Sequence, residues 1–257
     1  MKSHLYLLSL ALGATLFSAS PFSHAEAAPR SYAVMSLVGD AISLHTIRPS
    51  VGIRSEAETK NVLPIAEPVF DAAALRAANT AIKEVEPGAK IVLMMTQDAG
   101  LYQAQNAMFD EAHANKDNRD YLSSLLKDRG VTHLLLITKE RDNARFKLTN
   151  GYAGKGSLEG IGFYIDDTTR FHDSETSDSS QGMLGPFVYV KVRLLDAATL
   201  KPVRQIRAIV STILVRPSAL PNAMEMWTSM ASAKKVEHIE DLLDKAMKEA
   251  IAPVLAR

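Results

Sequence analysis

The stretch that decides the fold is Gly130-Val131-Thr132-His133-Leu134-Leu135-Leu136-Ile137-Thr138. It is an almost unbroken apolar run that follows a long helical pattern across a single glycine. A strand with one exposed face would alternate apolar and polar residues, and this run does not. We therefore expect a central strand that is buried on both faces, preceded by strands and helices and followed by antiparallel strands and a closing helix.

Two extended runs lie upstream of it, at residues 31–38 and 41–48. They are joined by Gly39-Asp40, and glycine in first place in a two-residue loop is typical of a type II′ hairpin. We expect the two runs to pair as an opening hairpin. Apolar residues then recur at three- and four-residue spacing, which predicts a helix that ends at Pro87-Gly88. A short apolar run at 90–96 predicts a second buried strand.

A long helical region at 101–128, broken near residues 115–118, leads into the central strand. Beyond that strand, the runs 187–195 and 203–215 alternate cleanly and predict a second antiparallel hairpin. An amphipathic helix over 236–251 closes the chain. Together these patterns predict the α+β class, with a mixed, mainly antiparallel sheet and helices packed on one face.

Composition limits the number of domains and the class of partner. The 257 residues are 47% apolar, and no linker divides them, so residues 31–257 are expected to form a single domain. Lys and Arg number 29, as do Asp and Glu. A balanced charge gives no global positive field to attract phosphate backbones, and we expect no nucleic-acid partner.

The first 25 residues have the pattern of a cleaved signal peptide. Lys2 is followed by an apolar core from Leu5 to Ala19 and by the small residues of Ser23-His24-Ala25 or Ala25-Glu26-Ala27. The core falls short of the roughly 20 residues that a membrane anchor needs. No later stretch approaches that length, so we expect a mature periplasmic protein without a transmembrane segment. The chain has no cysteine and hence no disulfide and no lipid-modified cysteine.

No motif in the chain predicts catalysis. The G-x-S-x-G motif of hydrolases does not occur, and its nearest imitation is Ser157 within the glycine-dense stretch 151–162. The P-loop spacing that would cradle a phosphate is also missing. Glycines in strands more often permit bulges or a close approach of backbones. We therefore expect a protein that is not an enzyme and has no cofactor.

Two stretches offer metal-binding atoms without metal-binding spacing. Met224, Met226 and Met230, followed by His238, carry thioethers that suit Cu(I), but flexible methionines also fill gaps in cores. The segment 166–182 holds several acidic residues and a histidine, but no EF-hand spacing organises them. Gap filling and a solvated loop are the favoured interpretations, and no metal site is assigned.

The segment 166–182 is also the longest predicted loop. It is polar and flanked by aromatic strand ends, and long loops on rigid scaffolds often carry binding. Aromatic residues at the base of a projecting hairpin would supply interface anchors. The residues predicted to bind on this reasoning are Phe163, Tyr164, Asp166, Asp167, His172, Phe187 and Tyr189.

Taken in order, the patterns resemble a periplasmic αβ domain. The resemblance rests on Tyr32-Ala33-Val34-Met35-Ser36-Leu37, Ile91-Val92-Leu93, Gly130-Val131-Thr132-His133-Leu134-Leu135-Leu136 and Val190-Lys191-Val192-Arg193-Leu194-Leu195-Asp196, together with the closing helix. This layout is similar to the group formed by the amino-terminal domain of TolB, the curli secretion pore protein and the lipoprotein activators of penicillin-binding proteins.

The resemblance implies a small sheet with helices on one face, acting by contact with other envelope components. The chain departs from that group in lacking the lipidated cysteine, in the additional strand at 41–48 and in the length of the segment 166–182. No functional residue of the group can be matched to a position here.

The function expected from the sequence is therefore that of a non-enzymatic exported envelope protein, a binding or assembly module that acts through protein contacts. Its partner would be another envelope protein, and it could form homo-oligomers. The alternative is a periplasmic protein that binds a small ligand or a metal with the glycine-dense strand and the acidic segment.

Overall fold

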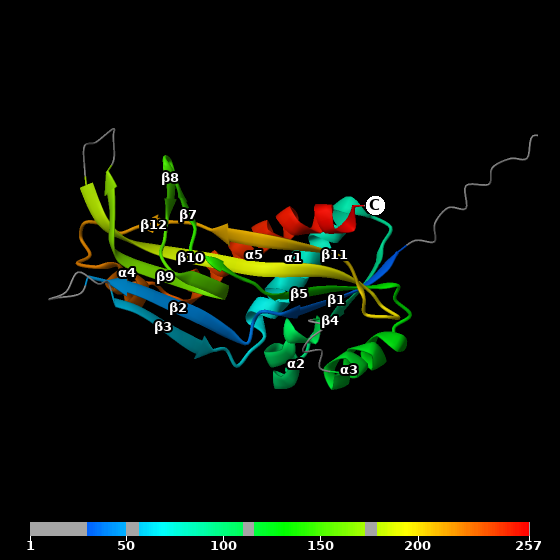
Figure 1. The fold of residues 1–257 in the computed structure, drawn as a ribbon. Helices are drawn as coiled ribbons and strands as arrows, with labels where there is room; N and C mark the ends of the chain where they lie inside the picture. The colour runs from blue at the N-terminus through cyan, green and yellow to red at the C-terminus, as the bar shows by residue number, and fades with distance from the viewer. Residues whose placement is uncertain (1–29, 50–56, 110–115, 173–178, 257) are drawn as a thin grey trace, which may run out of the picture.

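A computed structural model describes residues 30–49, 57–109, 116–172 and 179–256 (Figure 1). These residues form a ten-stranded mixed sheet, five α-helices, one 3₁₀-helix and a separate two-stranded ribbon, which confirms the predicted α+β class. The predicted signal peptide, residues 1–25, lies outside the described residues.

The elements follow one another in the order β1 (Ser31–Leu37), β2 (Ala41–Arg48), β3 (Ala57–Pro64), α1 (Val69–Val85), β4 (Lys90–Met94), α2 (Ala99–Ala104), η1 (Ala107–Phe109), α3 (Lys116–Lys127), β5 (His133–Lys139), β6 (Arg141–Asn143), β7 (Phe146–Leu148), β8 (Gly151–Ala153), β9 (Ser157–His172), β10 (Ser179–Asp196), β11 (Pro202–Ser211), β12 (Leu214–Val215), α4 (Ala223–Ser229) and α5 (Ser232–Leu255).

The predicted central strand is confirmed as β5. It lies between β1, with which it is parallel, and β10, with which it is antiparallel. Its side chains from Leu134 to Ile137 are fully buried, because helices cover both faces of the sheet at this point. Gly130 has a φ of 59°, as expected of the residue that ends the preceding helical segment.

The sheet is built in rows because β10 is 18 residues long. Strands β9 and β5 lie end to end along one edge of β10, and β11 and β12 lie along its other edge. The next row is formed by β2 beside β9 and β1 beside β5. The outermost row consists of β3 beside β2 and β4 beside β1.

The predicted opening hairpin is wrong. β1 and β2 do not pair with each other; they continue in the same direction through Gly39-Asp40 as two halves of one row. The dipeptide makes a bend and not a reversal, since the chain here is held by contacts with α1 that lie far away in the sequence.

The helices cover both faces of the sheet, whereas the sequence predicted one. Alternate side chains of β1 point to opposite sides: Tyr32 and Val34 belong to a core with α1, α4 and α5, while Ala33 and Met35 belong to a core with α2, η1 and α3. Figure 1 shows α2 and α3 on the side of β4 and β5 opposite to α5. The strict alternation of a strand explains how one apolar run serves two cores.

The segment 166–182 also differs from the predicted loop. β9 and β10 pair through it as far as His172 and Ser179, and the hairpin they form projects from one end of the molecule (Figure 1). Polar side chains of this segment satisfy one another within the strand: both oxygens of the buried Asp166 carboxylate accept hydrogen bonds from Thr168 and Thr169. Residues 173–178 lie outside the described residues.

Candidate binding surface on the outer edge of the sheet

The outer row presents the main chain of two strands. In the described part of the chain, β3 pairs with β2 alone and β4 pairs with β1 alone. Each strand therefore has one edge whose amide and carbonyl groups have no neighbouring strand. Such an edge is a template on which another chain can add a strand.

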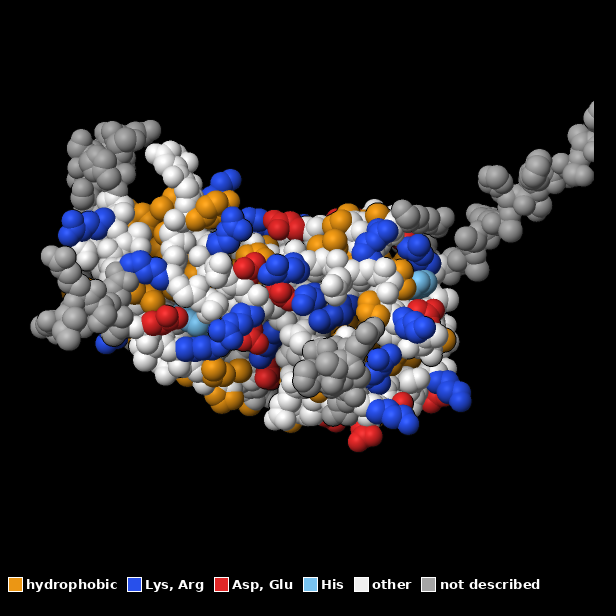
Figure 2. All heavy atoms as spheres, viewed as in Figure 1, with side chains coloured by type: hydrophobic (Ala, Val, Ile, Leu, Met, Phe, Trp, Pro, Cys, Tyr) orange, Lys and Arg blue, Asp and Glu red, His pale blue; other side chains and the backbone are white. Residues whose placement is uncertain are grey.

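Exposed apolar side chains gather along the same row. Val62 and Leu63 lie on β3, Leu93 lies on β4, and Met95 directly follows β4. They are four of the nine large hydrophobic side chains that are exposed among the described residues, although β3 and β4 are short. Figure 2 shows hydrophobic side chains at the lower edge of the molecule, where β3 lies in Figure 1. Apolar groups concentrated in this way mark contact surfaces.

A cleft separates the two halves of the row. Its volume is about 300 Å³, and it lies beyond the last residues of β3 and β4, next to the first turns of α1 and α2. The lining residues are Gly39, Asp40, Ile65, Ala66, Pro68, Gln97, Ala99, Tyr102 and Gln103. We call this hollow the strand-end cleft. The carboxyl ends of parallel strands β1 and β4 meet there, a place where open sheets commonly bind ligands.

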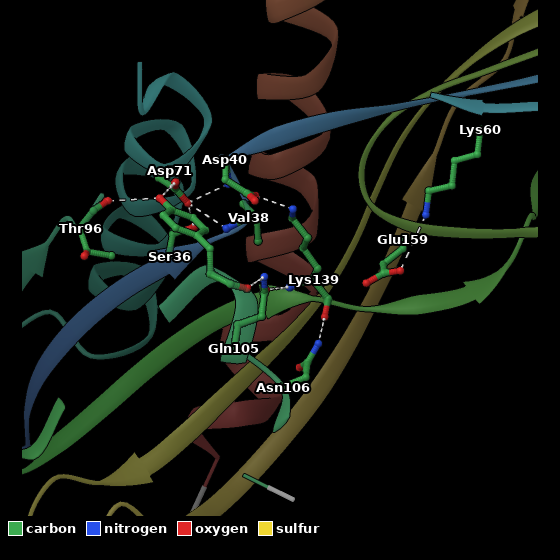
Figure 3. Close-up of polar contacts among 12 residues, drawn as sticks. Ser36, Val38, Asp40, Lys60, Asp71, Thr96, Gln105, Asn106, Lys139 and Glu159 are labelled. Carbon is green, nitrogen blue, oxygen red and sulfur yellow. Dashed lines mark hydrogen bonds and ion pairs between the residues drawn. The ribbon is translucent and has the colours of Figure 1, made fainter. Parts of the chain in front are cut away.

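The inner wall of the cleft is organised by Asp71 of α1, whose side chain is 2% exposed. Oδ1 of Asp71 accepts hydrogen bonds from the Ser36 hydroxyl at 2.6 Å and from the amides of Val38 and Gly39 at 3.0 and 3.1 Å. Oδ2 accepts one from the Tyr102 hydroxyl at 2.6 Å. Figure 3 shows Asp71 pointing from α1 toward Ser36 and Val38. One carboxylate thus joins β1, the bend, α1 and α2.

Residue 39 must be a glycine because the Asp71 side chain and backbone leave no room for a Cβ atom at this bend. A Cβ atom built on Gly39 would lie 2.6 Å from Oδ2 of Asp71 and 2.8 Å from its backbone nitrogen. Carbon atoms do not approach so closely, so any other residue would push α1 away from the sheet. The glycine that suggested a hairpin turn instead admits the Asp71 side chain.

The outer wall is fixed by α2 and η1. Oε1 of Gln105 accepts a hydrogen bond from the Lys139 amide at 2.7 Å, and the Asn106 side chain donates one to the Lys139 carbonyl at 2.8 Å. The ammonium group of Lys139 forms an ion pair with Asp40 at the rim (Figure 3). Burial and the hydrogen bond to Asp71 raise the pKa of Tyr102. The phenol therefore stays a hydrogen-bond donor and holds α2 in place.

The Asp71 carboxylate, the hydroxyls of Ser36 and Tyr102 and the amides of Val38 and Gly39 form what we call the Asp71 cluster. These groups bond to one another and leave a cleft wall of mixed polar and apolar character. Within residues 30–49, 57–109, 116–172 and 179–256, no group of three His, Cys, Asp or Glu side chains is placed to hold a metal ion. In the same ranges no helix is both long and apolar enough to cross a membrane.

The aromatic residues predicted to bind lie inside the molecule. Phe163 packs against Trp227 with ring centroids 4.6 Å apart, and Tyr164 packs against Phe146 at 4.9 Å. Phe187 and Tyr189 belong to the same core as Tyr164, and all four predicted side chains are at most 1% exposed. A partner touching the surface does not reach them, because these strands are covered on both faces.

The predicted polar residues have structural partners. Asp166 is buried and bonded to its two threonines, while Oδ1 of Asp167 accepts a hydrogen bond from the Ala223 amide at 2.6 Å and so holds the start of α4. The side chain of His172 lies outside the described residues. The structure does not bring these residues together with the strand-end cleft.

The other candidate groups also have packing roles. Met224, Met226 and Met230 pack against the core that includes α5. Ser157 accepts a hydrogen bond from Arg141 at 3.3 Å. In the glycine-dense stretch, a Cβ on Gly162 would lie 1.9 Å from the Ser43 carbonyl oxygen, so this glycine permits close approach of β2, as expected for a strand glycine.

Sequence reasoning missed Asp71, Tyr102 and the outer row. In the sequence Asp71 has the features of a residue at the start of a helix, and nothing near it shows that its partners are some 30 residues away on either side. The exposed β3 edge has a weak signal, since Asn61-Val62-Leu63 is a short apolar group in a polar segment.

Comparisons with known proteins find solved structures with a similar arrangement of elements but assign the chain to no family. No protein-family model matches the chain, and no curated protein matches its sequence. A neuraminyllactose-binding hemagglutinin homolog from Helicobacter pylori has a similar layout, with a TM-score of 0.41, 8% identity and coverage of 90% of this chain and 87% of that one.

Two further solved structures show the same kind of likeness. The PelC dodecamer from Paraburkholderia phytofirmans gives a TM-score of 0.31 at 9% identity, covering 89% of this chain and 88% of that one. Lipoprotein GNA1162 from Neisseria meningitidis gives 0.26 at 12% identity, covering 83% and 99%. The likeness to these solved structures is one of general arrangement, and no residue role follows from it. Membership of the group that contains the TolB domain stays a prediction.

Proposed function

We propose that this chain is a non-enzymatic binding module of the cell envelope that engages a partner protein along its outer row, β3 and β4. The observation that carries the proposal is the concentration of Val62, Leu63, Leu93 and Met95 on two strands whose outer edges have no neighbouring strand in the described structure. The N-terminal sequence pattern supports the envelope as the compartment.

The contact would combine main-chain and side-chain recognition. A partner strand laid along β3 would form hydrogen bonds with its unpaired amides and carbonyls, while the exposed apolar side chains would bury surface on both faces of the added strand. The strand-end cleft would accept a side chain of the partner at the point where β3 ends. The rigid Asp71 cluster supports this geometry, because a wall fixed before binding loses little entropy on binding.

A lysine on the outer row tests the proposal. Val62→Lys and Leu93→Lys place charge on the contact surface, and each should reduce co-purification of the partner from an envelope extract at least tenfold with an unchanged melting temperature. Val203→Lys is the matched control, because Val62 and Val203 are both 57% exposed and Val203 lies on β11 across the sheet. The partner recovered with the control should equal that recovered with the unmodified protein.

Self-association is a second outcome of the same experiment. If the recovered partner is another copy of this chain, sedimentation should show a dimer or larger assembly that Val62→Lys dissociates. Retention of the partner by both outer-row variants would remove β3 and β4 as the contact surface.

A further inference from the structure

A second hollow lies far from the outer row, between the β7–β8 ribbon, β11 and α5. Its volume is about 260 Å³. The ribbon contributes Lys147 and Tyr152, Arg145 directly precedes it, and α5 contributes Lys245 and Glu249. Figure 1 shows the ribbon standing up from the sheet, and Figure 2 shows Lys and Arg side chains beside it. We call this hollow the ribbon pocket.

The ribbon pocket concentrates positive charge in a chain whose total charge is balanced. Among the residues that line the pocket, Arg145, Lys147 and Lys245 share one carboxylate, that of Glu249; Lys245 and Glu249 also border a neighbouring hollow lined by Asp241, Asp244 and Lys248. None of the three cations forms an ion pair with a carboxylate within the described ranges, although other Arg and Lys residues nearby do so, such as Arg207 with Glu140 at 2.9 Å. Three cations that share a single carboxylate favour an anionic ligand, since it relieves their mutual repulsion.

Arg145 is positioned by its surroundings. Its amide donates a hydrogen bond to the Tyr189 hydroxyl at 2.9 Å, and its carbonyl accepts one from the Ser211 hydroxyl at 2.7 Å. The guanidinium carbon lies 4.6 Å from the centroid of the Tyr152 ring. Stacking on the ring leaves the N–H groups along the guanidinium edge available as a fork that matches the oxygens of a phosphate.

The base of the pocket has a different character. Ile209 and Val210 of β11 line it, and the exposed Tyr152 ring forms one side. A ligand that joins an anionic group to an organic part would therefore place its charge among the three cations and its apolar part against β11. Inorganic ions alone would leave this apolar part of the pocket unused.

We propose that the ribbon pocket binds a phosphate group carried by an organic molecule. The phosphate oxygens lie among Arg145, Lys147 and Lys245, and the organic part packs on Tyr152 and β11. A phospholipid headgroup and a soluble phosphate ester present the same chemistry, and the experiment below distinguishes them. The site is independent of the outer row, so either can fail without the other.

The test compares two triple variants with equal loss of charge. Arg145→Gln, Lys147→Gln and Lys245→Gln remove the three cations of the pocket; Lys83→Gln, Arg129→Gln and Lys201→Gln remove one exposed Arg and two exposed Lys elsewhere. The probes are glycerol 3-phosphate, followed by NMR titration, and sedimenting vesicles of phosphatidylglycerol or phosphatidylcholine. The unmodified protein and the control should bind a phosphate probe at least tenfold more tightly than the pocket variant.

The two probes distinguish the two sources of the phosphate group. Binding of glycerol 3-phosphate alone indicates a soluble ester, and binding of phosphatidylglycerol vesicles in preference to phosphatidylcholine indicates a lipid headgroup. Glu249→Gln removes the carboxylate that lines the pocket and should tighten binding about threefold. Equal binding by the two triple variants, or no binding of either probe by the unmodified protein, overturns the proposal.

Discussion

Replacing Asp71 by alanine should lower the free energy of unfolding by about 4 kcal/mol, because the change removes the acceptor of four hydrogen bonds, three of them buried. The hydroxyls of Ser36 and Tyr102 and the amides of Val38 and Gly39 all donate to this carboxylate. The Ser36 hydroxyl and the Val38 and Gly39 amides lose their acceptor in a buried site, while the Tyr102 hydroxyl keeps the Thr96 carbonyl oxygen at 3.2 Å. Urea unfolding at pH 7, followed by circular dichroism, measures the loss.

Two further variants show whether the effect belongs to the cluster. Tyr102→Phe removes one donor and should cost about 1 to 2 kcal/mol. Asp98→Ala is the matched control: Asp98 accepts a hydrogen bond from the Leu101 amide at the start of α2, and loss of such a cap costs about 1 kcal/mol. If Asp71→Ala proves no more destabilising than Asp98→Ala, the cluster does not organise the fold as described.

The stability of the protein should fall between pH 6.5 and pH 4 because of His45. Its side chain is 2% exposed, lies edge-on to Phe187 and has neither ring nitrogen hydrogen-bonded. Burial first, and then the charges of Lys60 and Arg141, lower the pKa of His45 to about 4, despite Glu58 at 3.9 Å from its Nδ1 atom.

The sign follows from proton binding. Below pH 6.5 the unfolded chain takes up a proton at His45, and the folded protein does so only near pH 4, so the unfolded state binds more protons in this window. The resulting loss is about 3 kcal/mol once pH has fallen to 4. Stability from this group is fully present above the unfolded pKa.

The measurement is the pH dependence of the unfolding free energy for His45→Leu relative to the unmodified protein. Leucine does not titrate, so the variant should lose this part of the slope between pH 6.5 and 4. Thr46→Val changes the neighbouring buried residue without removing a titrating group, and it should shift the curve while keeping its slope. Parallel curves for His45→Leu and the unmodified protein would contradict the assignment.

Sequence reasoning succeeded where burial alone determines the pattern. Leu134 to Ile137 form an unbroken apolar run because β5 has neighbours on both edges and helices on both faces, and such a run has few alternatives. Burial by distant segments also explains why the aromatic residues were predicted to be exposed binding residues although they lie in the core. Phe163 and Tyr189 sit at strand positions whose faces are covered by segments that the local pattern does not reveal.

The failure at Gly39-Asp40 has a different cause. A glycine at that position is compatible with a tight reversal and with the close approach of another element. Both arrangements require a residue without a side chain, so the glycine alone does not distinguish them. The choice is made by Asp71, which occupies the space that a Cβ would fill. The strand-end cleft could not be predicted for the same reason, since its walls come from segments that meet only in the folded chain.

The arrangement of the sheet in rows has a consequence for the order of folding. Ser31 bonds to Thr132 across 101 positions of the chain, and β2 pairs with β9 across more than a hundred. The inner neighbour of β1 is β5 and that of β2 is β9, and β5 and β9 are joined to each other through β10, so the sheet is complete only when β10 is present. Contacts of such long range make folding slow, in the range of milliseconds to seconds for domains rich in them. A nascent chain of this protein would therefore remain open until its last third emerges.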